Sequence, residues 1–123
     1  MTETAFVLDT NAAIYLLKYE KVPEPVASAD FAMSIITRIE LLSKRDISSE
    51  DEAELRSFMD DLMVVPINEA IEAATIALRR STKVKLPDAI IAATSIALNA
   101  VLLTHDDQLL KLTLPGYRVQ DIP

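Results

Sequence analysis

The sequence predicts a three-layer α/β/α fold, in which helices cover both faces of a central parallel sheet. Short apolar runs alternate with segments of helical periodicity along the 123 residues, which is typical of parallel α/β domains. Half of the residues are hydrophobic, with one glycine and no cysteine, which excludes disulfide scaffolds, cysteine zinc sites and low-complexity chains. Because the length suits one domain, we expect a single domain over residues 1–123.

The first strand and helix are predicted within the first 19 residues. Residues 5–8 form a short apolar run, and residues 9–11 are of the types that cap the start of a helix. The helix that follows is expected to run to about Tyr19. Two prolines within residues 22–25 then predict a turn.

The second strand is expected at residues 31–35, before two helices. The first of these helices has an apolar stripe that includes Ile36 and Ile39, and Glu40 lies at the border of this stripe. The second begins near Ser48, with acidic residues in its first turn, where the helix dipole favours them. We expect four of its apolar side chains to point inward: Leu55, Phe58, Met59 and Leu62.

Residues 63–67 predict a third strand, and Asn68 is expected to cap the helix after it. Pro87 stands at the first position of a further helix, where proline is tolerated. Residues 89–98 are almost all apolar, so this helix is expected to be buried on most sides. The chain ends with three short elements: a strand at 100–103, a helix at 108–112 and a strand at 117–119.

The charge of the chain is unevenly distributed. Nineteen acidic residues against twelve basic ones give a net charge of −7, which does not by itself suggest a nucleic-acid partner. Residues 46–61 contain seven of the acids and one base, so this segment carries −6 and the rest carries −1. We interpret the segment as a solvated helix face, which leaves the remaining surface free to meet a polyanion.

We expect a cytoplasmic protein that does not engage a membrane. The longest apolar runs are well below the ~20 residues that a membrane-spanning helix needs. The first residues lack the basic start and the long apolar stretch of a secretory signal.

Four carboxylates stand where solvation explains them poorly. Asp9 follows the first strand, Asp106 follows the fourth, Asp88 opens the buried helix and Glu40 borders an apolar stripe. Taken singly, Asp9 and Asp88 also suit helix starts, Asp106 suits a turn, and Glu40 is long enough to reach water. Because the carboxyl ends of parallel strands share one edge of a sheet, we expect Asp9 and Asp106 to meet there.

Anions crowded in this way repel one another unless they are protonated or bound to a cation. An all-oxygen ligand set suits Mg²⁺ or Mn²⁺ and not zinc. The sequence therefore predicts a divalent cation at this edge of the sheet.

The segments around the four carboxylates resemble the four motifs of PIN-domain ribonucleases, and most closely those of VapC toxins from toxin–antitoxin pairs. The motifs stand in the family's order and span essentially the whole chain: Val7–Asn11, Thr37–Leu41, Leu86–Ala93 and Leu103–Asp106. The resemblance implies a PIN-like α/β/α fold and a metal-dependent endoribonuclease, a hydrolase that cuts RNA phosphodiester bonds and acts as a toxin.

The resemblance also assigns site residues. It makes Asp9, Glu40, Asp88 and Asp106 the catalytic acids, with Mg²⁺ or Mn²⁺ on Asp9, Asp88 and Asp106 and a further contact from Glu40. Supporting positions are Thr10, Asn11 and Thr104. The family carries another acid and an aromatic residue after the last motif, whereas here Asp107 follows without an aromatic residue. The last ligand is therefore open between Asp106 and Asp107, and the sequence does not decide between one metal ion and two.

Three partners are expected. The resemblance implies a homodimer and a small VapB-like antitoxin whose C-terminal segment blocks the site with an arginine or lysine. The RNA contact is our own inference from the densest basic stretch, which directly precedes the Asp88 motif: Arg79, Arg80, Lys83 and Lys85. These cations have a second explanation, because a helix C-terminus also favours positive charge.

Two other functions remain open at this stage. One is a housekeeping PIN nuclease in RNA processing, and the other is a PIN-like module that binds RNA or protein without cutting. A phosphatase with an aspartyl nucleophile is disfavoured, because no second aspartate stands two residues after Asp9. His105 is placed beside the site, and we assign it no catalytic role.

Overall fold

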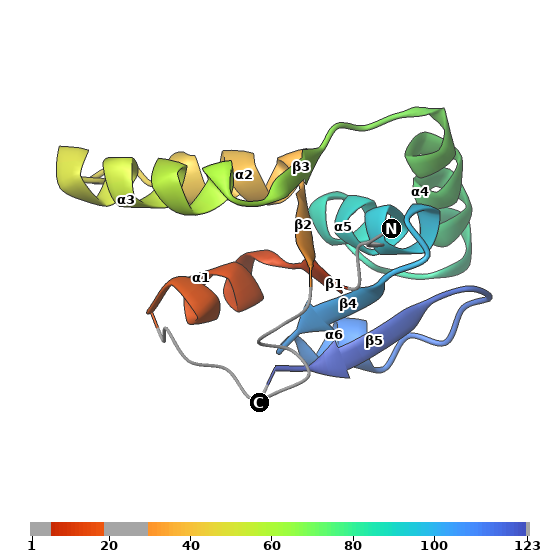
Figure 1. Cartoon of the computed structure of the whole chain (residues 1–123). Helices are drawn as coiled ribbons and strands as arrows, with labels where there is room; N and C mark the ends of the chain where they lie inside the picture. Colours follow the sequence, from red (N-terminus) through yellow and green to blue (C-terminus); the bar gives the residue numbers. More distant parts are fainter. Residues whose placement is uncertain (1–5, 19–29, 123) are drawn as a thin grey trace.

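The computed structural model describes residues 6–18 and 30–122, where strands and helices alternate in the predicted order (Figure 1). The strands are β1 (Phe6–Leu8), β2 (Phe31–Ser34), β3 (Met63–Val65), β4 (Val101–Thr104) and β5 (Arg118–Asp121). The helices are α1 (Thr10–Lys18), α2 (Ile35–Leu42), α3 (Ser49–Asp60), α4 (Glu69–Ser81), α5 (Leu86–Ala97) and α6 (Asp107–Leu110). The turn predicted at residues 22–25 lies outside the described residues.

The five strands form one parallel sheet in the order β3-β2-β1-β4-β5. The chain first adds strands on one side of β1 and then returns to add β4 and β5 on the other side. The direction of winding therefore reverses between β1 and β4. The carboxyl ends beside such a reversal are where parallel α/β folds place their binding sites.

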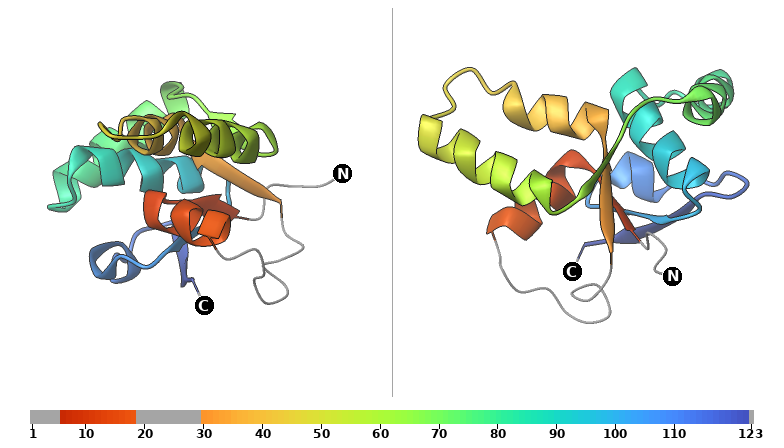
Figure 2. Two further views of the ribbon diagram at one scale, coloured as in Figure 1. Left: turned by 90° about the vertical axis from the view of Figure 1, so that its left-hand side faces the viewer. Right: turned by 45° about the horizontal axis from the view of Figure 1, so that its top comes forward.

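Helices cover both faces of this sheet, as the sequence predicts. Val7 points into a core shared with α4 and α5, whereas its neighbours Phe6 and Leu8 point into a core shared with α1, α2 and α3. In the right-hand view of Figure 2, β2 lies between the α2–α3 pair and the α4–α5 pair. The α/β/α layers and the parallel sheet are confirmed.

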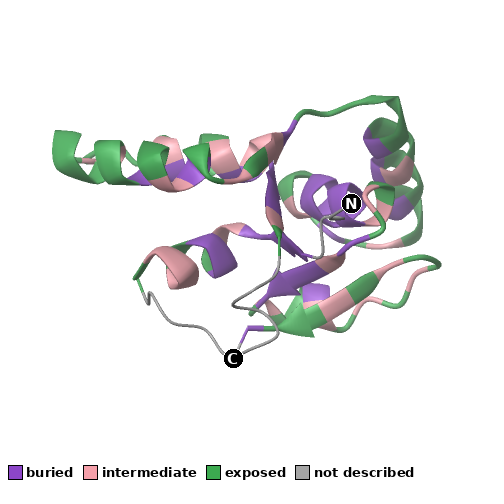
Figure 3. Ribbon diagram, in the orientation of Figure 1, coloured by how far each residue is buried: buried purple, intermediate pink, exposed green. Residues whose placement is uncertain are grey.

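Helix α5 is the most buried helix among the described residues. Every residue from Ala89 to Ser95 is buried, which confirms the expectation for this apolar segment. Its position under the sheet explains the burial, since α5 packs against β1, β2 and β4 as well as against α4. In Figure 3 this central region is mostly buried, while α3 and the outer side of α4 are largely exposed.

The prediction that the apolar stripe with Ile39 is the buried face of α2 is wrong. Ile39 is 53% exposed, and the buried residues of this helix are Thr37 and Leu41. Ser34 caps the helix by accepting a hydrogen bond from the backbone N–H of Ile36, so the helix begins at Ile35. Packing against the sheet then selects the face with Thr37 and Leu41, which local periodicity does not reveal.

Helix α6 also differs from its predicted range. It begins at Asp107 and ends at Leu110, because the side chain of Asp106 accepts a hydrogen bond from the backbone N–H of Leu109 and caps the helix there. None of the helices among the described residues combines the length and the apolar composition needed to cross a bilayer.

Candidate active site at the carboxyl ends of β1 and β4

Asp9 is the residue directly after β1, and it is only 4% exposed. Its Oδ1 accepts a 2.7 Å hydrogen bond from the backbone N–H of Ala12, which caps α1. Its Oδ2 accepts a hydrogen bond from the hydroxyl of Thr104, the last residue of β4. Asp9 therefore serves as a helix cap and also faces the point where the winding reverses.

Thr104 links two of the predicted site residues. Its Oγ1 donates to Asp9 and accepts a 3.0 Å hydrogen bond from the backbone N–H of Asp106. The half-buried side chain of Asp106 in turn caps α6. Asp107 is exposed and lies inside α6. Of the two candidates for the last ligand, the structure places Asp106 in the hydrogen-bonded network.

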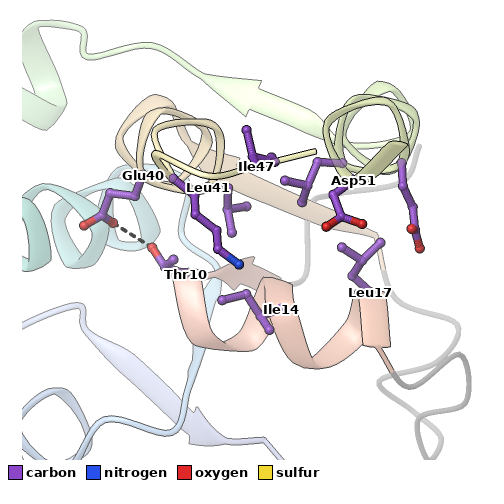
Figure 4. Close-up of a pocket in the computed structure, with 10 residues that line it drawn as sticks. Thr10, Ile14, Leu17, Glu40, Leu41, Ile47 and Asp51 are labelled. Atoms are coloured by element: carbon purple, nitrogen blue, oxygen red, sulfur yellow. Dashed lines mark hydrogen bonds between the residues drawn. The ribbon is translucent and has the colours of Figure 1, made fainter. Parts of the chain in front are cut away.

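Glu40 reaches the site from α2. Its Oε1 accepts a 2.6 Å hydrogen bond from Thr10 Oγ1 at the start of α1 (Figure 4). The side chain of Glu40 is exposed, so this contact fixes the position of a carboxylate that otherwise extends into solvent.

Asp88 lies in the first turn of α5, where it does not cap the helix. The N-cap position belongs to Lys85, which makes no side-chain capping hydrogen bond. Burial is the main cause that raises the pKa of Asp88, and the negative charges of Asp106, Glu40 and Asp9 raise it further. Lys85 partly opposes this shift.

Asp9 responds to the same charges. Burial raises the pKa of its carboxyl, and the charges of Asp106 and Glu40 add to the effect, while the hydrogen bonds from Thr104 and Ala12 oppose it. Carboxylates from four separate parts of the fold therefore lie within electrostatic reach of one another. The structure brings the four predicted acids to one region of the molecule.

The donor atoms at this site suit a hard divalent cation, because all four side chains offer carboxylate oxygens. Within residues 6–18 and 30–122, however, no three His, Asp or Glu side chains are gathered closely enough to hold one ion together. Three of the acids instead accept hydrogen bonds from neighbouring protein groups: Asp9 from Ala12 and Thr104, Asp106 from Leu109, and Glu40 from Thr10.

The basic stretch divides into two parts. Arg79 in the last turn of α4 donates from Nη1 to the carbonyl oxygen of Val84 at 2.8 Å, so this side chain joins α4 to the segment before α5. Lys85 stands nearer the carboxylates, since its charge acts on Asp88. Arg80 and Lys83 are exposed.

Sequence reasoning missed Tyr117. Its hydroxyl donates a 2.7 Å hydrogen bond to the carbonyl oxygen of Leu109 and so ties α6 to the segment before β5. Burial is the main cause that raises its pKa, and the charges of Asp9 and Asp106 contribute. No local motif marks this residue, because its position beside the site depends on how the last strand joins the sheet.

A groove of about 310 Å³ runs between α1, α2 and α3 and begins at Thr10 and Glu40 (Figure 4). Its apolar lining consists of Ile14, Leu17, Leu41, Ile47 and Leu55. Its charged lining consists of Glu40, Asp51 and Glu54 with one cation, Lys44. The groove is therefore apolar with a mainly acidic rim, and it leads to the site.

Solved structures share this fold over nearly the whole chain. A chain of VapBC2 from Rickettsia felis bound to a promoter DNA fragment is 21% identical with a TM-score of 0.79, covering 97% of this chain and 99% of that chain. A chain of DNA-bound VapBC from Salmonella typhimurium is 26% identical in sequence, with a TM-score of 0.73, and the match covers 98% of each chain. A chain of VapBC-1 from nontypeable Haemophilus influenzae is 27% identical in sequence, with a TM-score of 0.74, and the match covers 95% of this chain and 97% of that chain.

The expected resemblance to proteins of VapBC toxin–antitoxin systems is confirmed by the Salmonella and Haemophilus structures. No curated protein matches the chain. The PIN domain family matches residues 6–113, which include all four carboxylates. Because this match covers most of the 123 residues, the chain belongs to the PIN domain family.

Proposed function

We propose that this protein is a divalent-metal-dependent endoribonuclease and the toxin of a toxin–antitoxin pair. One observation carries the proposal: Asp9, Glu40, Asp88 and Asp106 come from separate elements, and the charges of Glu40 and Asp106 raise the pKa of both Asp9 and Asp88. Such crowding is unfavourable for folding, and a bound cation relieves it. Membership of the PIN family supports the same chemistry.

Asp9, Asp88 and Asp106 would hold Mg²⁺ or Mn²⁺, with Glu40 as a further ligand or as a group that orients water. When bound, the ion would lower the pKa of a water molecule and offset the charge that develops on the phosphate during hydrolysis. Mg²⁺ keeps several of its own waters, so few protein ligands suffice.

The other residues of the site position these acids. Thr104 fixes the orientation of the Asp9 carboxylate and, through the Asp106 backbone N–H, the start of α6. Thr10 holds Glu40 toward α1. Asn11, at the exposed start of α1, is proposed as a supporting residue, and Asp107 as a supporting acid.

The proposal is tested by replacing Asp9 or Asp88 with asparagine. We expect RNA cleavage to fall by about a hundredfold or more, because charge stabilisation by a bound metal contributes several kcal/mol. The measurement is cleavage of a labelled RNA in Mg²⁺ or Mn²⁺, with thermal unfolding of each variant to show that it is folded.

A matched control is Asp60→Asn, which removes an exposed acid at the end of α3. This variant should cleave like the unmodified protein. Wild-type cleavage by Asp9→Asn or Asp88→Asn would contradict the metal site. Binding of RNA without cleavage by the unmodified protein would instead make a PIN-like binding module the better description.

The antitoxin partner is proposed to occupy the α1–α2–α3 groove. The groove offers apolar side chains along its length and an acidic rim that suits a basic, amphipathic segment. Thr10 and Glu40 line the groove, so a segment bound there would lie beside the proposed catalytic acids. We also propose a homodimer, because the apolar side chain of Ile76 on α4 is exposed. Sedimentation of the purified protein tests whether it forms.

The groove is tested with Ile14→Glu, since Ile14 is 46% exposed and lines the groove. Expression of the protein should arrest growth, and co-expression of the small reading frame beside its gene should relieve the arrest. Ile14→Glu should still arrest growth but resist this relief, whereas Ile67→Glu, an exposed isoleucine outside the groove, should be relieved normally. If co-expression of the small reading frame relieved the growth arrest caused by Ile14→Glu as it does for the unmodified protein, the assignment of the groove would be contradicted.

A further inference from the structure

A second hollow lies along α1 and shares none of its described lining residues with the α1–α2–α3 groove. It has a volume of about 510 Å³ and is lined by Asn11 and Tyr15 of α1, by His105 after β4 and by Ile122 after β5. Figure 1 shows α1 and the carboxyl ends of β4 and β5 around this part of the molecule. The volume lies within the roughly 300–1,000 Å³ of small-ligand sites.

The hollow adjoins the proposed catalytic acids through the chain itself. Asn11 is two residues after Asp9, and His105 stands between Thr104 and Asp106. A ligand in this hollow therefore lies beside the site of the reaction.

The lining residues offer the contacts that a nucleobase uses. Tyr15 and His105 present aromatic rings, on which bases stack irrespective of their identity. The side-chain amide of Asn11 has donors and an acceptor that match the edge of a base, and Ile122 adds an apolar contact. The imidazole is held in place, because Nδ1 of His105 donates to Asp121 Oδ1 at 2.7 Å.

The chemistry of the lining favours a base over the other parts of RNA. Among the lining residues within 6–18 and 30–122, none is a lysine or an arginine, the residues that usually hold phosphates. Aromatic rings together with one amide are instead typical of sites that take an unstacked base from a single strand.

We propose that the hollow formed by Asn11, Tyr15, His105 and Ile122 binds one nucleobase of the RNA strand, next to the phosphodiester that is cut. This inference rests on the proposed ribonuclease function and adds a specificity site to it. The base enters between α1 and the ends of β4 and β5, while its backbone passes the carboxylates.

The first test changes the RNA and leaves the protein intact. A short RNA with a mapped cleavage position is prepared in versions that each lack the base at one nucleotide. We expect one position beside the cleaved bond to lose about tenfold in kcat/KM, since stacking on an aromatic side chain stabilises a bound base appreciably. An equal rate for all abasic versions would overturn the inference and leave the nuclease function standing.

The second test couples the RNA to the protein. His105→Ala removes an exposed ring and Tyr15→Leu removes the other, and each should weaken cleavage of the intact RNA about tenfold. Neither should weaken cleavage of the sensitive abasic RNA further, because the contact is already missing. If instead the substitution weakened cleavage of the abasic RNA as much as it weakens cleavage of the intact RNA, the inference would be overturned.

Two controls separate this site from general damage. Phe58→Leu removes a half-buried aromatic side chain that packs against the same core cluster as Tyr15, and it should leave the preference for the intact RNA unchanged. Binding of the RNA in EDTA, followed by fluorescence anisotropy, should show the same loss for His105→Ala without any cleavage. Absence of both binding and cleavage in the unmodified protein would overturn the inference together with the proposed function.

Discussion

Thr104 contributes one hydroxyl group to two hydrogen bonds, and these join the ends of β1, β4 and α6. It donates to Asp9 and accepts from the backbone N–H of Asp106. Since Asp9 also caps α1, one buried carboxylate has partners on both sides of the site. At the residue scale, the proposed catalytic acid is therefore positioned by groups that also stabilise the fold.

The raised pKa of Asp88 leads to a prediction about stability. A carboxyl group whose pKa is higher in the folded state binds more protons there, so its contribution to stability falls as the pH rises above the ordinary value of 3.8. Without metal, Asp88→Asn should therefore melt at a higher temperature than the unmodified protein at pH 7. The difference should shrink as the pH falls and should vanish below the ordinary value of 3.8, where Asp88 becomes neutral in both states.

The measurement is thermal unfolding in EDTA at a series of pH values. Asp60→Asn serves as the control, since Asp60 is exposed at the end of α3. A lower melting temperature for Asp88→Asn at pH 7 would contradict the electrostatic crowding that supports the proposed metal site.

At the scale of elements, α6 is a short helix whose start depends on one side chain. Asp106 accepts a 3.0 Å hydrogen bond from the backbone N–H of Leu109, and Tyr117 holds the other end of the helix through the carbonyl of Leu109. The same aspartate is proposed as a metal ligand, so its two roles must be separated by experiment.

Two substitutions of Asp106 separate the roles. Asp106→Asn keeps a good capping side chain and should change the free energy of unfolding little, but it should remove most of the stabilisation by Mn²⁺. Asp106→Ala loses the cap as well and should cost about 1 kcal/mol more in EDTA. Thermal unfolding with and without Mn²⁺ measures both effects. Asp107→Asn should retain the response to Mn²⁺, and loss of that response would make Asp107 the ligand instead.

At the scale of the whole molecule, the acidic segment and the basic stretch lie on different elements. Five of the seven acids of residues 46–61 lie on α3, whereas Arg79 and Arg80 stand in the last turn of α4 and Lys83 and Lys85 lie between α4 and α5. A net charge of −7 is therefore compatible with an RNA partner, because most of the excess negative charge lies on a different element from the basic residues that precede α5.

Replacing Lys83 and Lys85 with glutamine should reduce the salt dependence of RNA binding. Each lost contact with a phosphate of a single strand should lower the slope of log K against log salt by about 0.7, so the double variant should lose about 1.4. Binding in EDTA at several salt concentrations measures the slope. Arg56→Gln is the control, because Arg56 pairs with Glu52 on α3. An unchanged slope in the double variant would contradict a role for these lysines in binding RNA phosphates.

The sequence by itself determined the α/β class, the parallel sheet and the positions of Asp9 and Asp106 after two strands. These follow from short-range patterns, and the rule that parallel strands end at one edge converts them into a shared site. Tertiary structure decided which face of α2 is buried, that Thr10 holds Glu40, and that Tyr117 lies beside the acids. The physical reason is that such contacts join residues far apart in the chain, as Thr104 and Asp9 are by 95 positions, so packing selects them and no local periodicity records them.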